Sequence, residues 1–290
     1  SFPFSYATIA PGIPAQELDR QARRIGPALT GQSWRERAGR VTSLLRDWVN
    51  ETRVPMLVGA IAYDHQPTGY QRYNAALLFQ PGDSDVASYH KLHLVPFGEY
   101  VPFLETLPWL TALTPYDPDN VPTLAFGARP VWFDLGGYRY ATAICFEDTV
   151  PHLVRRLIGE VPDGRRPDVV LNLSNDGWFV DQRADGSRHK SSEHEMHLVV
   201  SVFRAIEHRI PLARSANTGV SAIVDGNGRV VRELETLKEG VVSGVVPLDG
   251  RRALYTAWGD WLGLTCLAVT LGLIPLGLLG WPALRTRRAS

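Results

Sequence analysis

The fold is decided by the stretch Tyr138-Arg139-Tyr140-Ala141-Thr142-Ala143-Ile144-Cys145-Phe146-Glu147-Asp148. A short apolar run, typical of a buried strand, ends there at a cysteine and is followed by two acids. A strand end fixes the position of the thiol, and the turn after it exposes backbone N–H groups that can bind an oxyanion. Cys145 is therefore a candidate nucleophile. The alternative is a free cysteine that packs as a small buried hydrophobe.

Two further strand ends carry polar residues. The first delivers Lys91 and then a Pro/Gly loop with an acid, in Tyr89-His90-Lys91-Leu92-His93-Leu94-Val95-Pro96-Phe97-Gly98-Glu99. The second runs into a polar turn, in Val169-Val170-Leu171-Asn172-Leu173-Ser174-Asn175-Asp176-Gly177-Trp178-Phe179.

Together these three stretches resemble the nitrilase (carbon–nitrogen hydrolase) superfamily, whose catalytic Glu, Lys and Cys each follow a strand. Within it, the chain is most similar to the apolipoprotein N-acyltransferase family. Two later runs add to this likeness and follow in the family's order, Arg204-Ala205-Ile206-Glu207 and Arg214-Ser215-Ala216-Asn217-Thr218-Gly219. The resemblance implies the α-β-β-α sandwich of the nitrilase fold.

The resemblance also implies roles for single residues. Cys145 would attack an acyl carbonyl and form a thioester, and Lys91 would favour the thiolate and stabilise the oxyanion. Glu99 would hold the lysine and assist proton transfer. The remaining family positions are expected to support the site or bind substrate: the backbone N–H of Phe146 as an oxyanion donor, Glu147 as a nearby carboxylate, and Asn175 and Trp178 as pocket residues.

The general base is not found among these residues. In the family, the catalytic Glu ends an early strand in a Trp-Pro-Glu run that this sequence lacks, and Ser1-Phe2-Pro3 is similar to the residues that come after that run. We therefore expect the chain to be N-terminally truncated just after that Glu. Glu17, the only early acid, is better explained as a first-turn carboxylate of a helix. A chain without its base is expected to have little or no activity.

The bulk composition excludes several classes of protein. The 290 residues include 30 Lys+Arg and 30 Asp+Glu, so no net positive field attracts nucleic acid. The two cysteines, Cys145 and Cys266, have neither disulfide-scaffold nor metal-site spacing. His189, His194, His197 and His208 cluster in one segment, but a polar helix face explains them better than a metal site. No cofactor and no metal are expected.

Strand-like and helical stretches alternate along the chain and predict an α/β domain with mixed sheets. Helices are expected near 14–19, over 34–49, 150–159 and 192–208. Strands are expected over 55–63, 74–79, 86–91, 131–135, 138–145, 169–173, 220–224, 230–234 and 241–247. Residues 103–122 and 182–190 are interpreted as long polar or aromatic loops. The catalytic domain would span residues 1–255.

A hydrophobic segment follows this domain. Residues 261–281 carry no charge, and roughly 20 residues at ~1.5 Å rise cross a ~30 Å hydrocarbon core. Trp258, Trp261 and Trp281 lie at its ends, where interfacial aromatics are common, and Arg285 begins a basic tail. We therefore predict a transmembrane helix over 256–283 and a cytoplasmic tail over 284–290. A buried core helix is the alternative.

These observations and the resemblance lead to one functional prediction. The protein would be a multi-pass enzyme of the bacterial inner membrane whose catalytic domain faces the periplasm. It would move an acyl chain from a phospholipid, through a Cys145 thioester, to the N-terminal amine of a diacylglyceryl-cysteine lipoprotein. A soluble nitrilase-type amidase and a membrane-tethered pseudoenzyme that lacks the Glu are the alternatives.

Overall fold

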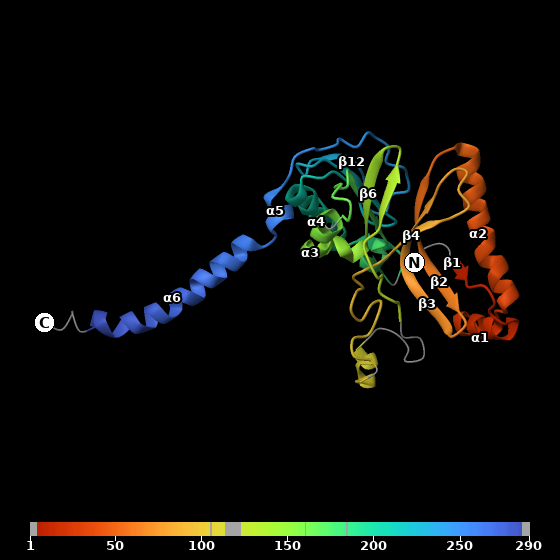
Figure 1. Ribbon diagram of the computed structural model, residues 1–290, viewed down its shortest axis with the longest axis horizontal. Coiled ribbons are helices and arrows are strands. Elements are labelled where there is room, and N and C mark those ends of the chain that lie inside the picture. Colours follow the sequence, from red (N-terminus) through yellow and green to blue (C-terminus); the bar gives the residue numbers. More distant parts are fainter. Residues whose placement is uncertain (1–4, 105, 114–122, 160, 184, 286–290) are drawn as a thin grey trace.

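Two mixed β-sheets stack face to face and form the centre of the molecule (Figure 1). The computed structural model describes residues 5–104, 106–113, 123–159, 161–183 and 185–285, with side chains up to residue 275. The first sheet has the order β1-β2-β3-β4, and the second has the order β12-β11-β10-β7-β6-β5. The strands of the first sheet are β1 (Ser5–Ile9), β2 (Met56–Gln66), β3 (Gly69–Phe79) and β4 (Ala87–His90).

The second sheet is parallel at its centre and antiparallel at both edges. Its strands are β5 (Trp132–Leu135), β6 (Tyr138–Ile144), β7 (Val169–Ser174), β10 (Leu212–Ala216), β11 (Ser221–Val224) and β12 (Val230–Leu234). β7 pairs in parallel with both β6 and β10. Since the carboxyl ends of parallel strands meet at one edge, the turns after β6 and β7 are neighbours in space.

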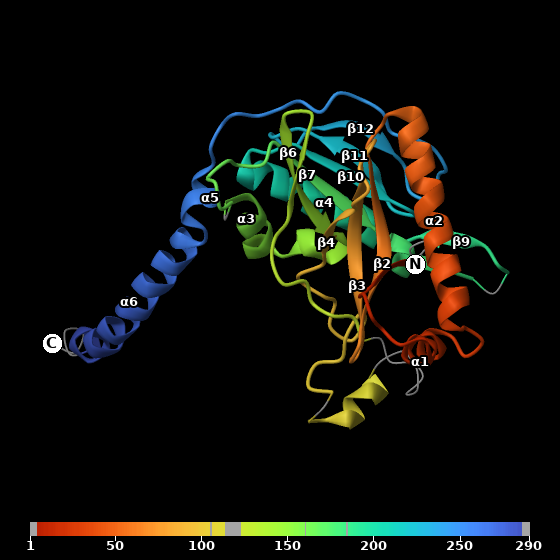
Figure 2. The ribbon, with the colours of Figure 1, turned by 45° about the vertical axis from the view of Figure 1, so that its right-hand side comes forward.

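Helices cover the outer face of each sheet, giving four layers in the order α-β-β-α (Figure 2). α1 (Ala15–Ile25) and α2 (Gly31–Thr52) lie on the first sheet, where Val49 packs on Ala60 and Leu77. α3 (Pro151–Gly159) and α4 (Ser192–His208) lie on the second. The layers predicted from the resemblance are confirmed.

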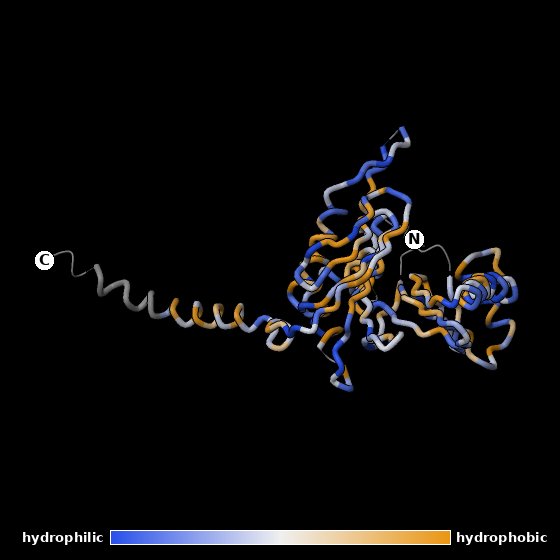
Figure 3. The backbone as a smooth tube through the Cα atoms, turned by 90° about the horizontal axis from the view of Figure 1, so that it is seen from above, coloured by the Kyte–Doolittle hydropathy of each residue, from blue (hydrophilic) through white to orange (hydrophobic). Residues whose placement is uncertain are grey.

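The core follows from strand alternation. In β3, Leu77 contacts the α2 side of the sheet, whereas Ala76 and Leu78 contact the second sheet. Such a strand is buried on both faces and therefore reads as a continuous apolar run. Figure 3 shows apolar residues concentrated along the strands of both sheets.

Three segments differ from the sequence-based prediction. Residues 5–9, interpreted as part of a loop, form β1 and pair in parallel with β2. Part of the polar segment 182–190 forms a hairpin, β8 (Val180–Gln182) with β9 (Arg188–Lys190). The stretch 241–247, predicted as a strand, is extended chain outside both sheets: Val241 and Val245 are 91% and 86% exposed, because β12 is the edge of its sheet as described and does not bury them. Within the predicted loop 103–122, Pro108–Leu113 forms a 3-10 helix, and residues 114–122 lie outside the described part.

The chain leaves the sandwich through α5 (Leu254–Trp258) and then forms α6 (Trp261–Arg285), which extends away from the domain (Figure 1). α6 covers the segment for which a transmembrane helix is predicted. Among the described residues, no helix combines the length and the apolar character needed to cross a bilayer. Of the predicted basic tail, residues 286–290 lie outside the described part.

Candidate active site

Cys145 sits on a sharp turn at the end of β6. It is the first residue of the 3-10 turn η3 (Cys145–Thr149), and its backbone φ is 50°. A side chain at positive φ costs roughly 1–2 kcal/mol, so the surrounding structure has to hold this conformation. Ile144 is fully buried, whereas Cys145 is partly exposed. The turn therefore brings the thiol out of the core and to the surface of a cavity.

That cavity has a volume of about 490 Å³ and is formed by the loop after β4, the turns after β6 and β7, and α4. Its polar side chains come from Glu99, Cys145, Thr149, Glu193 and His197. Most of its wall is apolar, however, and is made by Val95, Phe146, Trp178, Phe179, Met196 and Val200. The space beside the thiol therefore suits a hydrocarbon better than a small polar molecule.

Lys91 lies behind this wall and is fully buried. Its Nζ donates hydrogen bonds to both carboxylate oxygens of Glu99, at 3.0 and 2.8 Å. Glu99 also accepts from the side chain of Asn74 and from the backbone N–H of Val95, each at 2.8 Å. Since a buried ammonium needs a partner, Glu99 fixes the lysine while presenting its own edge to the cavity.

Glu147 is also fully buried but does not line the cavity. Its carboxylate accepts hydrogen bonds from the backbone N–H groups of Ile144, Leu92 and His93, at 2.7, 2.6 and 3.0 Å, and from the Tyr89 hydroxyl at 2.8 Å. Burial raises the pKa of Glu147 to about 7, although hydrogen bonds from Ile144 and Tyr89 oppose this. Glu147 thus connects the cysteine turn with the segment after Lys91.

Asn175 and Trp178 belong to the turn after β7 and have different places in it. Asn175 precedes the 3-10 turn η4 (Asp176–Phe179), and its side chain accepts a hydrogen bond from the backbone N–H of Gly177 at 3.1 Å. It does not line the cavity. Trp178 does, and it is 64% exposed at the same time. Asn175 therefore shapes the turn, and Trp178 forms part of the cavity rim.

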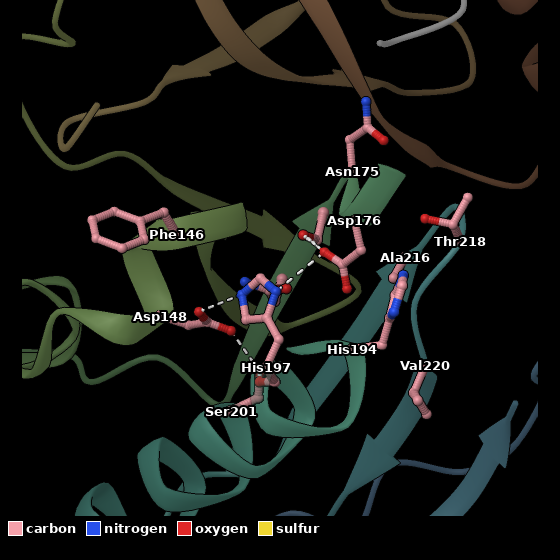
Figure 4. A network of polar contacts seen from close by, with 12 residues as sticks. Phe146, Asp148, Asn175, Asp176, His194, His197, Ser201, Ala216, Thr218 and Val220 are labelled. Carbon is pink, nitrogen blue, oxygen red and sulfur yellow. Dashed lines mark hydrogen bonds and ion pairs between the residues drawn. The ribbon is translucent and has the colours of Figure 1, made fainter. Parts of the chain in front are cut away.

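The interpretation of the histidines as a polar helix face is wrong. His194, His197 and His208 are buried, His197 with 6% of its surface exposed. His197 lies between two aspartates and also lines the cavity (Figure 4). Its spacing to His194 contained no signal for this place, because both aspartates come from distant turns. Among the described residues no group of three or more His, Cys, Asp or Glu could hold a metal ion.

The structure therefore brings most of the predicted site residues together. Cys145, Phe146, Glu99 and Trp178 line one cavity, and Lys91 is bonded to Glu99 from behind. Glu147 and Asn175 shape the turns instead. The chemical roles of these residues, and a general base upstream of Ser1, stay predictions.

The family model for carbon–nitrogen hydrolases matches residues 15–255 of this sequence. The chain belongs to the carbon–nitrogen hydrolase family. The nitrilase fold of this family was the fold predicted from the three strand ends. Among solved structures, the glutamine-dependent NAD+ synthetase from Acinetobacter baumannii is similar, with a TM-score of 0.51 at 16% identity over 81% of this chain and 38% of that one. This neighbour supports the fold alone.

Curated relatives within the carbon–nitrogen hydrolases point more narrowly. The chain is 31% identical over 261 residues to the apolipoprotein N-acyltransferase of Geobacter metallireducens, covering 87% of this chain and 46% of that protein. It is 34% identical over 206 residues to the one of Chlorobaculum tepidum, covering 69% of this chain and 36% of that protein. The resemblance seen in the sequence is confirmed. The chain spans less than half the length of these relatives.

Proposed function

We propose that this carbon–nitrogen hydrolase domain is the catalytic part of an apolipoprotein N-acyltransferase. The observation that carries the proposal is the position of Cys145, whose strained turn opens onto an apolar cavity that it shares with Glu99. The name of the curated relatives supports the same function. The donor would be a phospholipid, and the acceptor would be a lipoprotein with a diacylglyceryl-cysteine at its N-terminus.

In the first half-reaction, the Cys145 thiolate attacks the ester carbonyl of the phospholipid. The carbonyl electrons move to oxygen, where the Lys91 ammonium and the Phe146 backbone N–H stabilise the oxyanion. Collapse forms the thioester and releases the lysophospholipid alcohol, which takes the proton that the thiol gave to the base. The predicted upstream Glu would be that base, with Glu99 in support.

In the second half-reaction, the α-amine of the lipoprotein attacks the thioester carbonyl. The new amide bond forms, the sulfur leaves as the thiolate, and the base accepts the proton lost by the amine. One nucleophile thus serves two substrates in turn, which is ping-pong chemistry. Neither step uses a cofactor or a metal.

The apolar cavity favours acyl transfer over hydrolysis of small amides. Each buried CH₂ group contributes roughly 0.8 kcal/mol, so a cavity of this kind binds a long acyl chain far better than a short polar amide. A soluble amidase would need polar groups for its substrate where this cavity has Val95, Met196 and Val200. A pseudoenzyme is the remaining alternative, because no general base is identified within this sequence.

We also propose that α6 anchors the domain in the inner membrane of a bacterium, with the catalytic domain on the periplasmic side. The described part of α6 makes no core with the sandwich, and Figure 3 shows it as an apolar stretch. Arg285 and the basic residues after it would stay in the cytoplasm. Large apolar side chains are exposed along the described part of α6: Leu262, Leu264, Leu267, Val269, Leu271, Leu273 and Ile274.

Intact-mass measurement of the full-length protein after incubation with phospholipid vesicles tests the proposal. We expect a mass gain of one acyl chain, removed by hydroxylamine and absent in Cys145→Ser. Addition of a diacylglyceryl-cysteine peptide is expected to discharge the chain onto the peptide amine. A hydrolytic enzyme would instead release free fatty acid without the peptide, and a pseudoenzyme would gain no mass. Either result contradicts the proposal.

A further inference from the structure

Beside the cavity, four buried charged side chains close a ring. They are Asp148, Asp176, His197 and Arg214, which are between 0% and 6% exposed. His197 lies 2.9 Å from Asp148 through Nε2 and 3.1 Å from Asp176 through Nδ1. Arg214 contacts the other oxygen of each aspartate, at 3.2 and 2.7 Å. Each carboxylate therefore bridges both cations.

The ring joins elements that are far apart in the sequence. Asp148 belongs to η3, the turn that begins with Cys145, and Asp176 belongs to η4, the turn that carries Trp178. His197 comes from α4 and Arg214 from β10. Figure 4 shows His197 reaching from its helix to both aspartates at once. His197 therefore connects the two turns that form facing parts of the cavity wall.

The charge balance favours an imidazolium at this place. With a protonated His197, two cations face two carboxylates, whereas a neutral imidazole would leave one net negative charge buried, which is costly. Burial opposes the charged imidazole, but the hydrogen bonds to Asp148 and Asp176 outweigh it and raise the pKa of His197 to about 9. Arg214 Nη2 also lies 2.9 Å from His197 Nδ1, and Asp176 accepts from both cations.

Of the four ring members, only His197 also lines the cavity. Its ring packs edge-on against Phe179, another wall residue, with a centroid distance of 6.2 Å. A change at His197 is therefore transmitted to both turns and to the wall. None of the ring atoms has a role in the proton transfers of the proposed reaction.

We propose that His197 is a positioning residue that holds the Cys145 turn and the Trp178 turn at the spacing that acyl transfer needs. This inference rests on the proposed function and deepens it. The thiolate and the Phe146 N–H have to face one carbonyl, and displacement of reacting groups by about 1 Å costs roughly 100-fold in rate. The ring sets this distance from behind the wall.

The test separates positioning from charge. His197→Gln alone leaves a buried negative charge near the thiol and would also lower thiolate reactivity. The double variants Asp148→Asn/His197→Gln and Asp176→Asn/His197→Gln keep the ring neutral but replace the charged bridge between the turns. Two rates are compared in full-length protein: alkylation of Cys145 by iodoacetamide, and acylation by phospholipid.

We expect the alkylation rate and the melting temperature of the double variants to stay near those of the native protein, while the acylation rate falls roughly 100-fold. Ser201→Ala is the control, because it removes a hydrogen bond to Asp148 from the same helix but leaves the ring of four charges closed. Its acylation rate is expected to stay near native.

Three results would contradict parts of this account differently. Double variants that acylate at the native rate overturn the positioning role alone. Double variants that lose their folded state, or lose alkylation and acylation together, assign the ring to folding and also overturn it. A native protein that takes up no acyl chain overturns the proposed function itself, and with it this inference.

Discussion

Glu147 accepts a 2.6 Å hydrogen bond from the backbone N–H of Leu92, and this contact joins the two sheets at the candidate active site. Leu92 follows the strand that delivers Lys91, whereas Glu147 follows Cys145 by two residues. The same carboxylate accepts from Ile144, directly before the cysteine, at 2.7 Å. One buried side chain thus holds together the segments that carry the nucleophile and the cation.

Replacement of Glu147 by Gln is expected to destabilise the domain and impair the site. An amide has one acceptor oxygen, and its NH₂ group would face N–H donors from Leu92, His93 or Ile144. A buried donor without a partner costs roughly 1–3 kcal/mol. Thermal unfolding and the acylation rate of Cys145 measure the two effects. Glu193→Gln is the control, since Glu193 lines the same cavity on an exposed helix turn; equal effects of both variants would contradict this role for Glu147.

Replacement of Glu99 by Gln is expected to leave the buried Lys91 ammonium without its carboxylate. Breaking a buried ion pair on one side costs roughly 3–5 kcal/mol of stability. Denaturant unfolding measures this loss, and mass spectrometry follows acyl-enzyme formation, which is expected to fall below detection. Glu195→Gln breaks the solvent-exposed pair with Lys190 and is expected to change neither. An active, stable Glu99→Gln would show that the lysine needs no carboxylate.

Replacement of Val200 by Trp is expected to shorten the cavity. The indole would fill space beside Cys145, so acylation by long-chain phospholipids is expected to fall roughly tenfold or more. A short-chain activated ester, which needs less of the cavity, should still acylate Cys145. Val199→Trp is the matched control, because Val199 is the preceding residue on the same helix but is 44% exposed and does not line the cavity. Loss of both reactions in Val200→Trp would indicate general damage instead.

The stability contributed by His197 is expected to fall at alkaline pH. Its pKa is raised to about 9 in the folded protein, from 6.5. Between these values the folded state binds more protons than the unfolded state, so the free energy of unfolding decreases as pH rises. The contribution is complete below about pH 6.5 and is lost as pH passes 9, a change of roughly 3 kcal/mol.

Denaturant unfolding at pH 6.5 and pH 9.5 measures this dependence. The hydrogen bond from His197 and the charge of Arg214 hold the pKa of Asp176 below its usual range despite burial, so Asp176 does not titrate in this window. His197→Gln is expected to remove the decrease. The same slope in His197→Gln and in the native protein would mean that another group causes it.

Much of this protein could be predicted from local sequence. The apolar runs around β3, β6 and β7 are continuous because both of their faces are buried, and this is visible without a structure. Gly136 and Gly137, which both adopt positive φ in the turn between β5 and β6, marked a tight hairpin because glycine alone adopts such angles at little cost. The position of Cys145 at a strand end followed from the same pattern.

Pairing across the chain was decided by the tertiary structure alone. Periodicity shows which residues are buried but not which buried groups meet. The parallel pairing of β6 with β7 places Asp148 and Asp176 close enough for His197 to bridge them, and the packing of the two sheets places Leu92 against Glu147. The sequence by itself determined the strands, the nucleophile and its motifs. Only the fold determined the partners, because hydrogen bonds and ion pairs depend on distances between segments that are remote in sequence.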